Sequence, residues 1–495
     1  MRMKKEIYVK LSIAVILIAA ILRFAFALSH TVSGDACWHL ASARFIAEHD
    51  KVPLFEGLGR LQPFWPPPLF HFAAALLYKI FSLISFDIAQ ISLKLVSPIF
   101  GTLTAIVAYL ITRKLFDEKT AFYSVIFLNF VPLFLDYSVF SYTDSTTAFF
   151  SVLAIYLMLN GRHILSSASL GLAMLSKYNA VFVLPMLLYL AYKFSINKKE
   201  RTIRMLAVFF LPLLISSVWL LRNFTLLGNP FWPYLNGIFG GADIGISFNT
   251  IDFKPLLSFN SYLRAYLELF GVPNGDISLL YFFNTPFLKY LLFIWAAATL
   301  IFVCPFITGL FRKPKKQGNG HFLKSVYILF LSHFVMLLIY LVNTRWFGSR
   351  LLLPAIPFMA IVWANGLDSI KIKKAYIFIA LIISIGFVGV EAAKISIAAR
   401  EWSLYSQDFE WAKNNSRESD IFYGNGQCLS YNIDRLVIDH TSPFEPGKVD
   451  YAWINNKWRI DFSMNDASLA EIKNSGKLKI VYDNPDTGTT IYKAK

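Results

Sequence analysis

Residues 375–393 read AYIFIALIISIGFVGVEAA, an almost unbroken apolar run between a basic loop and a tail of mixed charge. A helix needs roughly 20 apolar residues to cross the hydrocarbon core of a bilayer. Similar runs recur upstream, and 56% of the 495 residues are hydrophobic while only 16% are charged. Neither a soluble globular chain nor a disordered one has this composition. The sequence therefore predicts an α-helical polytopic membrane protein.

The net charge of +16 lies in the part of the chain before the end of this run. Residues 394–495 hold 13 Lys and Arg against 14 Asp and Glu, whereas residues 1–393 hold 34 against 17. Short basic loops mark the cytoplasmic side of a membrane protein. The charge thus fits a membrane protein among membrane lipids, and we expect no nucleic-acid partner.

The three cysteines, Cys37, Cys304 and Cys428, are too few for a disulfide framework or a Cys-rich metal site. A bridge between Cys37 and Cys428 would require that both face the outside, and their number alone does not favour it. We therefore expect no disulfide.

The amino terminus starts with a basic segment, residues 1–10, followed by the apolar run 11–22. This pattern is also typical of a signal peptide, with residues 25–27 (AFA) as the cleavage site. We favour an uncleaved first span, because Arg23 interrupts the run near that site and many spans follow. Both interpretations place the chain outside after residue 28.

The positive-inside rule decides the remaining topology. If the apolar segment 69–84 does not span, all later basic loops fall on the side of the amino terminus; if it does, all of them face outside. We therefore treat 69–84 as a segment that does not span. The predicted spans that follow it are 88–112, 120–140, 146–159, 164–176, 179–192, 205–221, 286–311, 322–342, 351–367 and 375–393. We predict about eleven transmembrane helices, a cytoplasmic amino terminus and a large first external loop, 29–87, in which 69–84 is a packed helix.

Two further parts are expected outside. Residues 223–285 are rich in Gly, Pro, Asn and aromatic side chains, which indicates a loop covering a cleft. Residues 394–495 carry a helix-like stretch over 405–414 and strand patterns over 479–482 and 489–492. This tail is predicted to be a small external α/β domain.

Asp35 stands at the beginning of residues 33–50 (SGDACWHLASARFIAEHD), whose spacing predicts a helix lying at the outer interface of the membrane. A carboxylate there can accept a proton from a hydroxyl or an amine, as a general base does. The alternative is a helix cap, which the local pattern alone favours.

Asp144 is predicted at the external end of the third span and has the same capping alternative. Together with Asp35 it could share the role of base or hold a divalent metal ion; whether a metal is used stays open, and no other cofactor is expected. Asp136 lies deeper in a span, where an ionisable group is usually paired. It is a second-rank candidate.

Four cations are predicted on the outer side, where Lys and Arg are normally depleted: Lys177, Arg222, Arg345 and Arg350. Their recurrence indicates an anionic partner, such as a phosphate or diphosphate at the depth of the lipid headgroups. The alternative is snorkelling to lipid phosphates. His39 and His71, also external, lack further ligands at metal-binding spacing, so we expect them to pack rather than bind zinc.

Six short segments carry a family resemblance in their order along the chain: 34–35 (GD), 67–69 (PPL), 142–144 (YTD), 171–178 (GLAMLSKY), 222–233 (RNFTLLGNPFWP) and 350–357 (RLLLPAIP). They resemble membrane glycosyltransferases of the GT-C superfamily that use a polyprenyl-phosphate or dolichyl-phosphate sugar. The similarity is greatest to the dolichyl-phosphate-mannose protein mannosyltransferase and aminoarabinose transferase group.

The resemblance implies a GT-C-like fold and transfer of a sugar from a lipid-phosphate carrier to a protein, lipid or glycan on the outer face. It implies that Asp35 is the base of a direct, inverting displacement and that Asp144 is the second external acid. The phosphate leaving group would be bound by the four cations, and the substrate by Trp65, His39 and Asn223. Trp65 could stack on a sugar face or simply anchor the loop at the interface.

Two departures from the family restrict the acceptor. The Glu-Lys-Pro of aminoarabinose transferases is replaced by WPP at 65–67, and the Trp-Trp-Asp of oligosaccharyltransferases is absent from the tail. The rival function is a transporter or flippase of lipid-linked sugars, although transporters place charges near mid-membrane, whereas here they gather at one face. A surface-polysaccharide ligase or polymerase would differ mainly in its acceptor.

Overall fold

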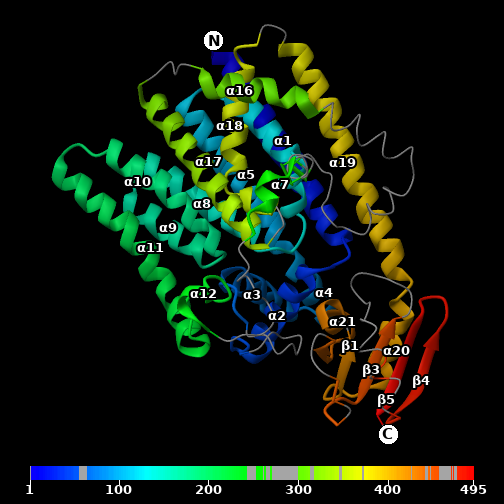
Figure 1. Cartoon of the computed structure of the whole chain (residues 1–495). Helices are drawn as coiled ribbons and strands as arrows, with labels where there is room; N and C mark the ends of the chain where they lie inside the picture. Colours follow the sequence, from blue (N-terminus) through cyan, green and yellow to red (C-terminus); the bar gives the residue numbers. More distant parts are fainter. Residues whose placement is uncertain are drawn as a thin grey trace.

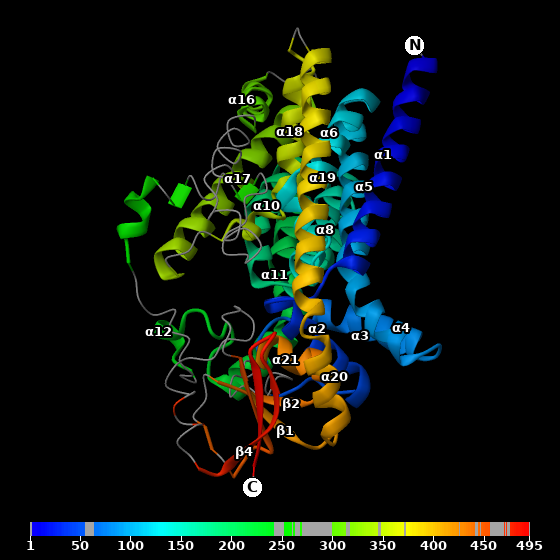
Figure 2. The same ribbon diagram turned by 90° about the vertical axis from the view of Figure 1, so that its right-hand side faces the viewer.

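The computed structural model describes residues 2–54, 64–241, 252–259, 299–312, 317–344, 348–370, 373–424, 426–440, 447–455 and 476–494, with a few single residues and pairs between them. Helices form a bundle, and a small sheet domain lies at the end of the bundle opposite the amino terminus (Figures 1 and 2). This is the predicted fold class.

Five helical stretches among the described residues are long and apolar enough to cross a bilayer. They are α1 (Arg2–Ser29), the run of α4 (Phe86–Ser92), η1 (Leu93–Leu95) and α5 (Val96–Leu115), then α11 (Lys198–Leu227), α17 (Gln317–Thr344) and α19 (Lys373–Ser403).

Shorter helices occupy the other predicted spans. These are α6 (Glu118–Phe130) with α7 (Pro132–Tyr137), α8 (Asp144–Leu159), α9 (His163–Met174), η2 (Tyr178–Val183) with α10 (Leu184–Lys193), η4 (Leu300–Phe302) with α16 (Val303–Phe311), and η5 (Ser349–Leu352) with α18 (Ile356–Leu367). Each predicted apolar segment thus coincides with helix, except that 286–298 lies outside the described residues.

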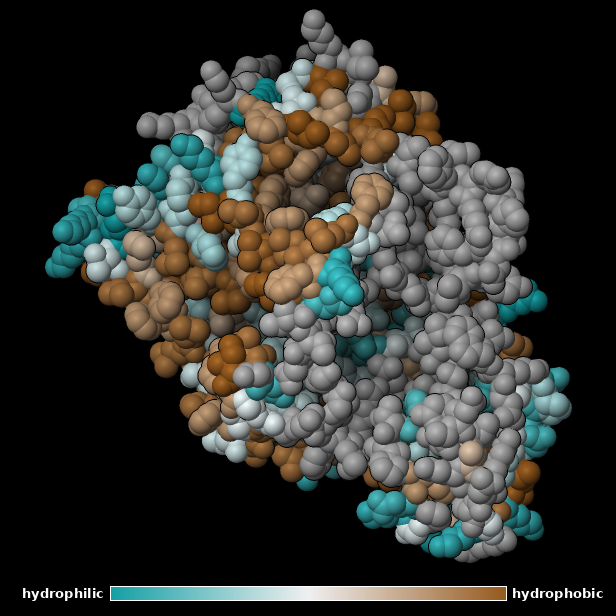
Figure 3. Space-filling view, viewed as in Figure 1, coloured by the Kyte–Doolittle hydropathy of each residue, from teal (hydrophilic) through white to brown (hydrophobic). Residues whose placement is uncertain are grey.

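The outer surface of the bundle is apolar. Ile21 of α1 is 68% exposed and Val218 of α11 is 76% exposed, although both side chains are aliphatic. Figure 3 shows hydrophobic side chains over the bundle and hydrophilic ones on the sheet domain. An exposed apolar surface of this extent is expected where helices face lipid tails.

Small residues let the inner helices approach closely. A Cβ on Gly309 of α16 would lie 1.9 Å from the carbonyl oxygen of Val362, and one on Gly366 of α18 would lie 1.8 Å from that of Pro305. The two backbones therefore touch, as small residues permit between membrane helices.

The segment predicted as the first external loop contains α2 (Asp35–His49) and α3 (Leu69–Ser82) among its described residues, and the two helices pack against each other. They lie at the end of the bundle that carries the sheet domain (Figure 1). α3 has 14 residues, so it is about as long as the shorter helices assigned to spans. That it packs within the loop and does not span stays a prediction.

The C-terminal domain is an α/β unit built on a sheet of order β2-β1-β3-β5-β4. Its elements are α20 (Ser406–Asn415), β1 (Ile421–Gly424), α21 (Gly426–Ile433), β2 (Leu436–Asp439), β3 (Tyr451–Asn455), β4 (Leu478–Asn484) and β5 (Thr489–Ala494). Outside this domain, α12 (Asn236–Phe239) and η3 (Lys254–Leu257) lie in residues 223–285, the segment predicted as the second external loop. Strands β1, β2 and β3 pair in parallel, and β3, β5 and β4 antiparallel.

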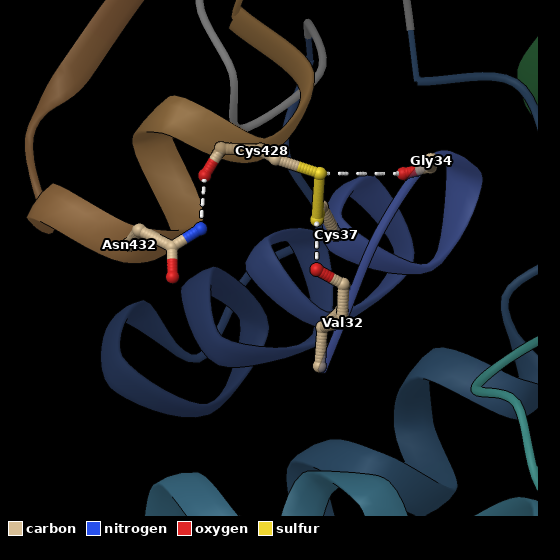
Figure 4. The surroundings of a disulfide bond; sticks show 5 residues. All are labelled: Val32, Gly34, Cys37, Cys428 and Asn432. Atoms are coloured by element: carbon tan, nitrogen blue, oxygen red, sulfur yellow. Dashed lines mark hydrogen bonds between the residues drawn. A yellow bond between two sulfur atoms is a disulfide. The ribbon is translucent and has the colours of Figure 1, made fainter. Parts of the chain in front are cut away.

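A disulfide joins Cys37 of α2 to Cys428 of α21, with the two Cα atoms 5.0 Å apart (Figure 4). Our expectation of no disulfide is therefore wrong. The two cysteines are 391 residues apart in sequence, and only the docking of α21 on α2 brings them together.

Candidate active site

Asp35 is the first residue of α2, and its carboxylate faces a cation. Arg350 of η5 donates through Nη1 to Asp35 Oδ2 at 3.0 Å. The Asp35 side chain is 42% exposed and so can be reached by a substrate. The N-cap of α2 is Gly34, and no side-chain cap bond is formed. The capping interpretation, which the local sequence favours, is therefore wrong for Asp35.

Asp144 is the first residue of α8 and pairs with the second cation. Lys177, between α9 and η2, donates through Nζ to Asp144 Oδ1 at 2.7 Å. The Asp144 side chain is only 2% exposed, and its Oδ2 has no hydrogen-bond partner among the described residues. The N-cap of α8 is Thr143 and not Asp144, and the Thr143 side chain forms no cap bond.

The two ion pairs form one cluster of alternating charge. Burial lowers the pKa of the Lys177 ammonium; Arg350 adds to this, while Asp144 and Asp35 oppose it. Burial also acts to lower the pKa of Arg350, but the carboxylates of Asp35 and Asp144 hold it well above its ordinary value. Each of the two cations therefore lies within electrostatic reach of the other cation and of both carboxylates.

Tyrosines that the sequence analysis missed surround these charges. The Arg350 guanidinium lies 5.6 Å from the centre of the Tyr142 ring. Tyr234, in the second external loop, and Tyr340, on α17, both lie within electrostatic reach of Arg350 and Asp144. Their positions in the sequence could have indicated them: Tyr142 stands two residues before Asp144, and Tyr234 directly follows the segment 222–233.

His39 lies one turn after Asp35 and is paired with His71. The distance from His39 Nδ1 to His71 Nε2 is 3.0 Å, and both side chains are buried. Burial, together with the positive charges of Arg350 and Lys177, lowers the pKa of His39 to about 3. His39 is therefore neutral at physiological pH, and the two rings pack together as expected.

Arg222 and Asn223, at the end of α11, contact the chain around Trp65. Arg222 donates to the carbonyl oxygens of Phe64 at 2.8 Å and Pro53 at 3.2 Å. Asn223 donates to the Trp65 carbonyl at 3.3 Å. Asn223 also donates to the hydroxyl of Tyr178, the residue after Lys177, at 2.9 Å. Arg222 and Asn223 therefore hold the chain around Trp65, and Asn223 also contacts the neighbour of Lys177.

The Trp65 ring lies among other aromatic side chains. Its centre is 5.9 Å from that of Tyr234 and 6.5 Å from that of Trp232. Because Tyr234 also reaches the charged cluster, this aromatic group adjoins the ion pairs.

Of the two remaining candidates, only Asp136 is among the described residues. Arg345 is outside the described residues. Asp136 of α7 accepts from Lys394 of α19 at 3.3 Å, and Lys394 also contacts Glu391 at 2.9 Å. Asp136 thus belongs to a separate buried ionic group and is paired, as expected for a carboxylate in a span.

The charged cluster suits an anion better than a divalent metal ion. Asp35 and Asp144 each pair with a cation, and the described residues contain no group of three or more His, Cys, Asp or Glu that could hold a metal. A divalent ion needs several oxygen ligands, which this arrangement does not present. We therefore derive no step through a metal.

Comparison with known proteins agrees with this picture. Residues 66–221 match the family described as dolichyl-phosphate-mannose-protein mannosyltransferase. This match supports the resemblance seen in the sequence and indicates a glycosyltransferase. A comparison with curated protein sequences finds no match.

Solved structures share the fold. ArnT from Cupriavidus metallidurans in the apo state aligns over 97% of both chains with 13% identity and a TM-score of 0.62. The same enzyme bound to undecaprenyl phosphate gives 14% identity and 0.60, again over 97% of both chains. The oligosaccharyltransferase of Archaeoglobus fulgidus aligns over 90% of this chain and 69% of its own, with 12% identity and a TM-score of 0.56.

Proposed function

We propose that this protein transfers a sugar from a polyprenyl-phosphate carrier to an acceptor on the outer face of the membrane. One observation carries the proposal: an accessible carboxylate, Asp35, lies 3.0 Å from the guanidinium of Arg350 and within electrostatic reach of Lys177. A base and the cations for an anionic leaving group are thus side by side. The family match over 66–221 supports the same reaction class.

Each charged side chain has a role in this reaction. The acceptor hydroxyl or amine loses its proton to Asp35 and attacks the anomeric carbon of the sugar. The bond from that carbon to the phosphate oxygen breaks, and the electron pair leaves with the phosphate. Arg350 and Lys177 stabilise the charge that develops there. Attack opposite the leaving group inverts the anomeric configuration.

Asp144 supports the cations in this scheme. Its buried carboxylate fixes the Lys177 ammonium at 2.7 Å and acts electrostatically on Arg350. The positive charges are thereby held in place before the donor arrives, and preorganised charges of this kind stabilise a transition state without reorganisation.

The disulfide supports an outward-facing site. Disulfides persist in oxidising compartments and are rare in the cytosol, and Cys37 lies only two residues after Asp35. The same reasoning supports an external C-terminal domain, which carries Cys428. It agrees with the positive-inside distribution of the basic loops.

The partners follow from the fold neighbours. ArnT has been solved with undecaprenyl phosphate, and the archaeal oligosaccharyltransferase with a tethered acceptor peptide. By analogy we propose a lipid-linked sugar as donor and a protein, lipid or glycan as acceptor. The transporter alternative is less favoured, because the family that matches residues 66–221 is described as a mannosyltransferase.

Transfer from radiolabelled polyprenyl-phosphate sugars to a membrane extract tests the proposal. We expect label in an acceptor with the wild-type protein, and Asp35→Asn should lower the rate roughly 10²–10⁴-fold, the usual effect of losing a general base. The matched control is Asp87→Asn, an exposed aspartate on α4, which should transfer at the wild-type rate. Near wild-type turnover by Asp35→Asn would remove Asp35 as the base.

A further inference from the structure

We propose that the C-terminal domain is a positioning part of the active site, which holds α2 so that Asp35 meets Arg350. This inference rests on the proposed function. It assigns positioning roles to the disulfide Cys37–Cys428 and to the ion pair between Arg44 and Asp434.

The disulfide acts at the turn of α2 that carries the base. Cys37 follows Asp35 by two residues, and both sulfur-bearing side chains are fully buried. Figure 4 shows Cys428 beside the start of α2, with its Sγ 3.9 Å from the carbonyl oxygen of Gly34. Gly34 has φ of +55°, a backbone conformation that glycine adopts readily. The sulfur bridge therefore touches the bend from which Asp35 emerges.

A second contact fixes the direction of α2. Arg44, seven residues beyond Cys37, forms an ion pair with Asp434, the residue after α21. The same guanidinium also donates from Nε to Glu48 at 2.8 Å. The side chain of Arg44 is 14% exposed, so this pair is partly shielded from water. Two attachment points about two turns apart prevent α2 from rotating on α21.

Apolar packing fills the space between these points. Leu40 of α2, Leu429 and Ile433 of α21, and Phe422 and Trp453 of the sheet belong to one buried cluster. α2 therefore shares its core with the C-terminal domain as well as with α3.

The position of α2 determines the distance between Asp35 and Arg350. The Asp35–Arg350 contact is 3.0 Å, so a shift of α2 by about 1 Å would take it beyond good hydrogen-bond geometry. Misplacement of this size at a reacting group costs up to roughly 100-fold in rate. Because Arg350 lies in η5 of the bundle while Asp35 begins α2, their relative position depends on what holds α2.

The first test removes the bridge with Cys37→Ser/Cys428→Ser. We expect the donor KM to change little and kcat per folded enzyme to fall roughly tenfold, within the range that a small misplacement produces. In wild-type protein a mild reductant should cause the same fall, reversed on reoxidation, while the double variant should not respond to the reductant. Unchanged kcat in both experiments would overturn the proposal. No transfer by the wild type would instead count against the proposed function.

The second test uses the ion pair and does not depend on folding without the disulfide. Arg44→Asp should lower kcat, and adding Asp434→Arg should restore most of it by reversing the pair. Glu445→Lys breaks the exposed Glu445–Lys448 pair of the same domain and should leave kcat unchanged. Failure of the reversed pair to restore kcat, with folded protein confirmed by gel filtration, would contradict the positioning role.

Discussion

At the scale of single residues, the Asp144–Lys177 pair is the more buried of the two ion pairs in the site. The carboxylate is 2% exposed and its partner 21%. Removing one partner of a buried pair leaves an uncompensated charge and costs about 3–5 kcal/mol, whereas removing both costs far less. Lys177→Met should therefore unfold at a markedly lower temperature, and Lys177→Met/Asp144→Asn should regain most of that stability but remain inactive.

Thermal unfolding in detergent, followed by fluorescence, measures this difference. The control is Lys79→Met, which breaks the exposed Lys79–Asp50 pair and should shift Tm very little, since surface pairs contribute about 0–1 kcal/mol. If the double variant is as unstable as the single one, the unpaired charge is not the cause.

The buried His39 predicts a dependence of stability on pH. Its pKa is lowered from 6.5 to about 3, first by burial and then by Arg350 and Lys177. Between these values the unfolded chain binds more protons than the folded one, so the free energy of unfolding falls as pH falls from about 6.5. His39→Asn should make Tm fall less steeply between pH 6.5 and 5 than in the wild type. His49→Asn, exposed at the end of α2, should keep the wild-type slope, and an unchanged slope for His39→Asn would refute the linkage.

The charged residues of the cluster could be predicted from sequence because each of them stands in one of the short segments that carry the family resemblance. Asp35, Asp144, Lys177 and Arg350 were all selected on position and motif, and the structure brings them together. The Cys37–Cys428 bridge could not be predicted, because no pattern in the sequence shows that α21 docks on α2. The tyrosines around Arg350 could not be predicted for a similar reason. The chain contains 24 tyrosines, and only the folded structure shows which of them lie near the charges.

At the scale of elements, the end of α11 holds the first external loop in place. The Arg222 guanidinium bonds the carbonyl oxygens of Phe64 and Pro53 and lies 4.4 Å from the centre of the Trp219 ring. A lysine keeps the charge but cannot bridge two carbonyls or stack in this way. Arg222→Lys should lower the free energy of unfolding by about 2 kcal/mol, the order expected for hydrogen bonds to a charged group.

Two measurements separate this clamp from a phosphate-binding role. Loss of the clamp lowers Tm, whereas loss of a phosphate ligand raises the donor KM of the folded enzyme. We expect the first effect to dominate, with Arg162→Lys, at an exposed position between α8 and α9, as a neutral control. An unchanged Tm with a raised KM would move Arg222 into the donor site.

Secondary structure was predictable where the pattern is periodic or the segment long. The apolar segments became helices, and α20, β4 and β5 match the predicted stretches of the tail. β1, β2 and β3 were missed because they are short, four or five residues each, and β3 is buried at every position. A strand buried on both faces shows no alternation, so its sequence resembles any short apolar run.

At the scale of the whole molecule, the amino terminus and the C-terminal domain lie at opposite ends of the bundle (Figure 2). The candidate site lies towards the end that carries the C-terminal domain, because α2 begins with Asp35 and is covalently joined to α21. Charge arithmetic predicts which end faces the cytoplasm, since loops rich in Lys and Arg stay inside. The fold itself has no direction in the membrane, so the orientation has to be measured on intact cells.

Single cysteines introduced at exposed positions test the orientation. With Cys304 replaced by Ser and the Cys37–Cys428 bridge kept, we expect Leu83→Cys, after α3, and Leu257→Cys, in the second external loop, to react with a membrane-impermeant maleimide. Ile196→Cys, between α10 and α11, should react only after permeabilisation, because its loop carries Lys193, Lys198 and Lys199. The native side chains are 86%, 90% and 89% exposed, respectively, so burial does not limit labelling. Labelling of Ile196→Cys alone in intact cells would mean either that α3 spans the membrane, which turns every later loop to the other side, or that the whole protein is inverted. Protection of Leu83→Cys alone would show that the end of α3 is buried in lipid, while the sides of the later loops would stay as predicted.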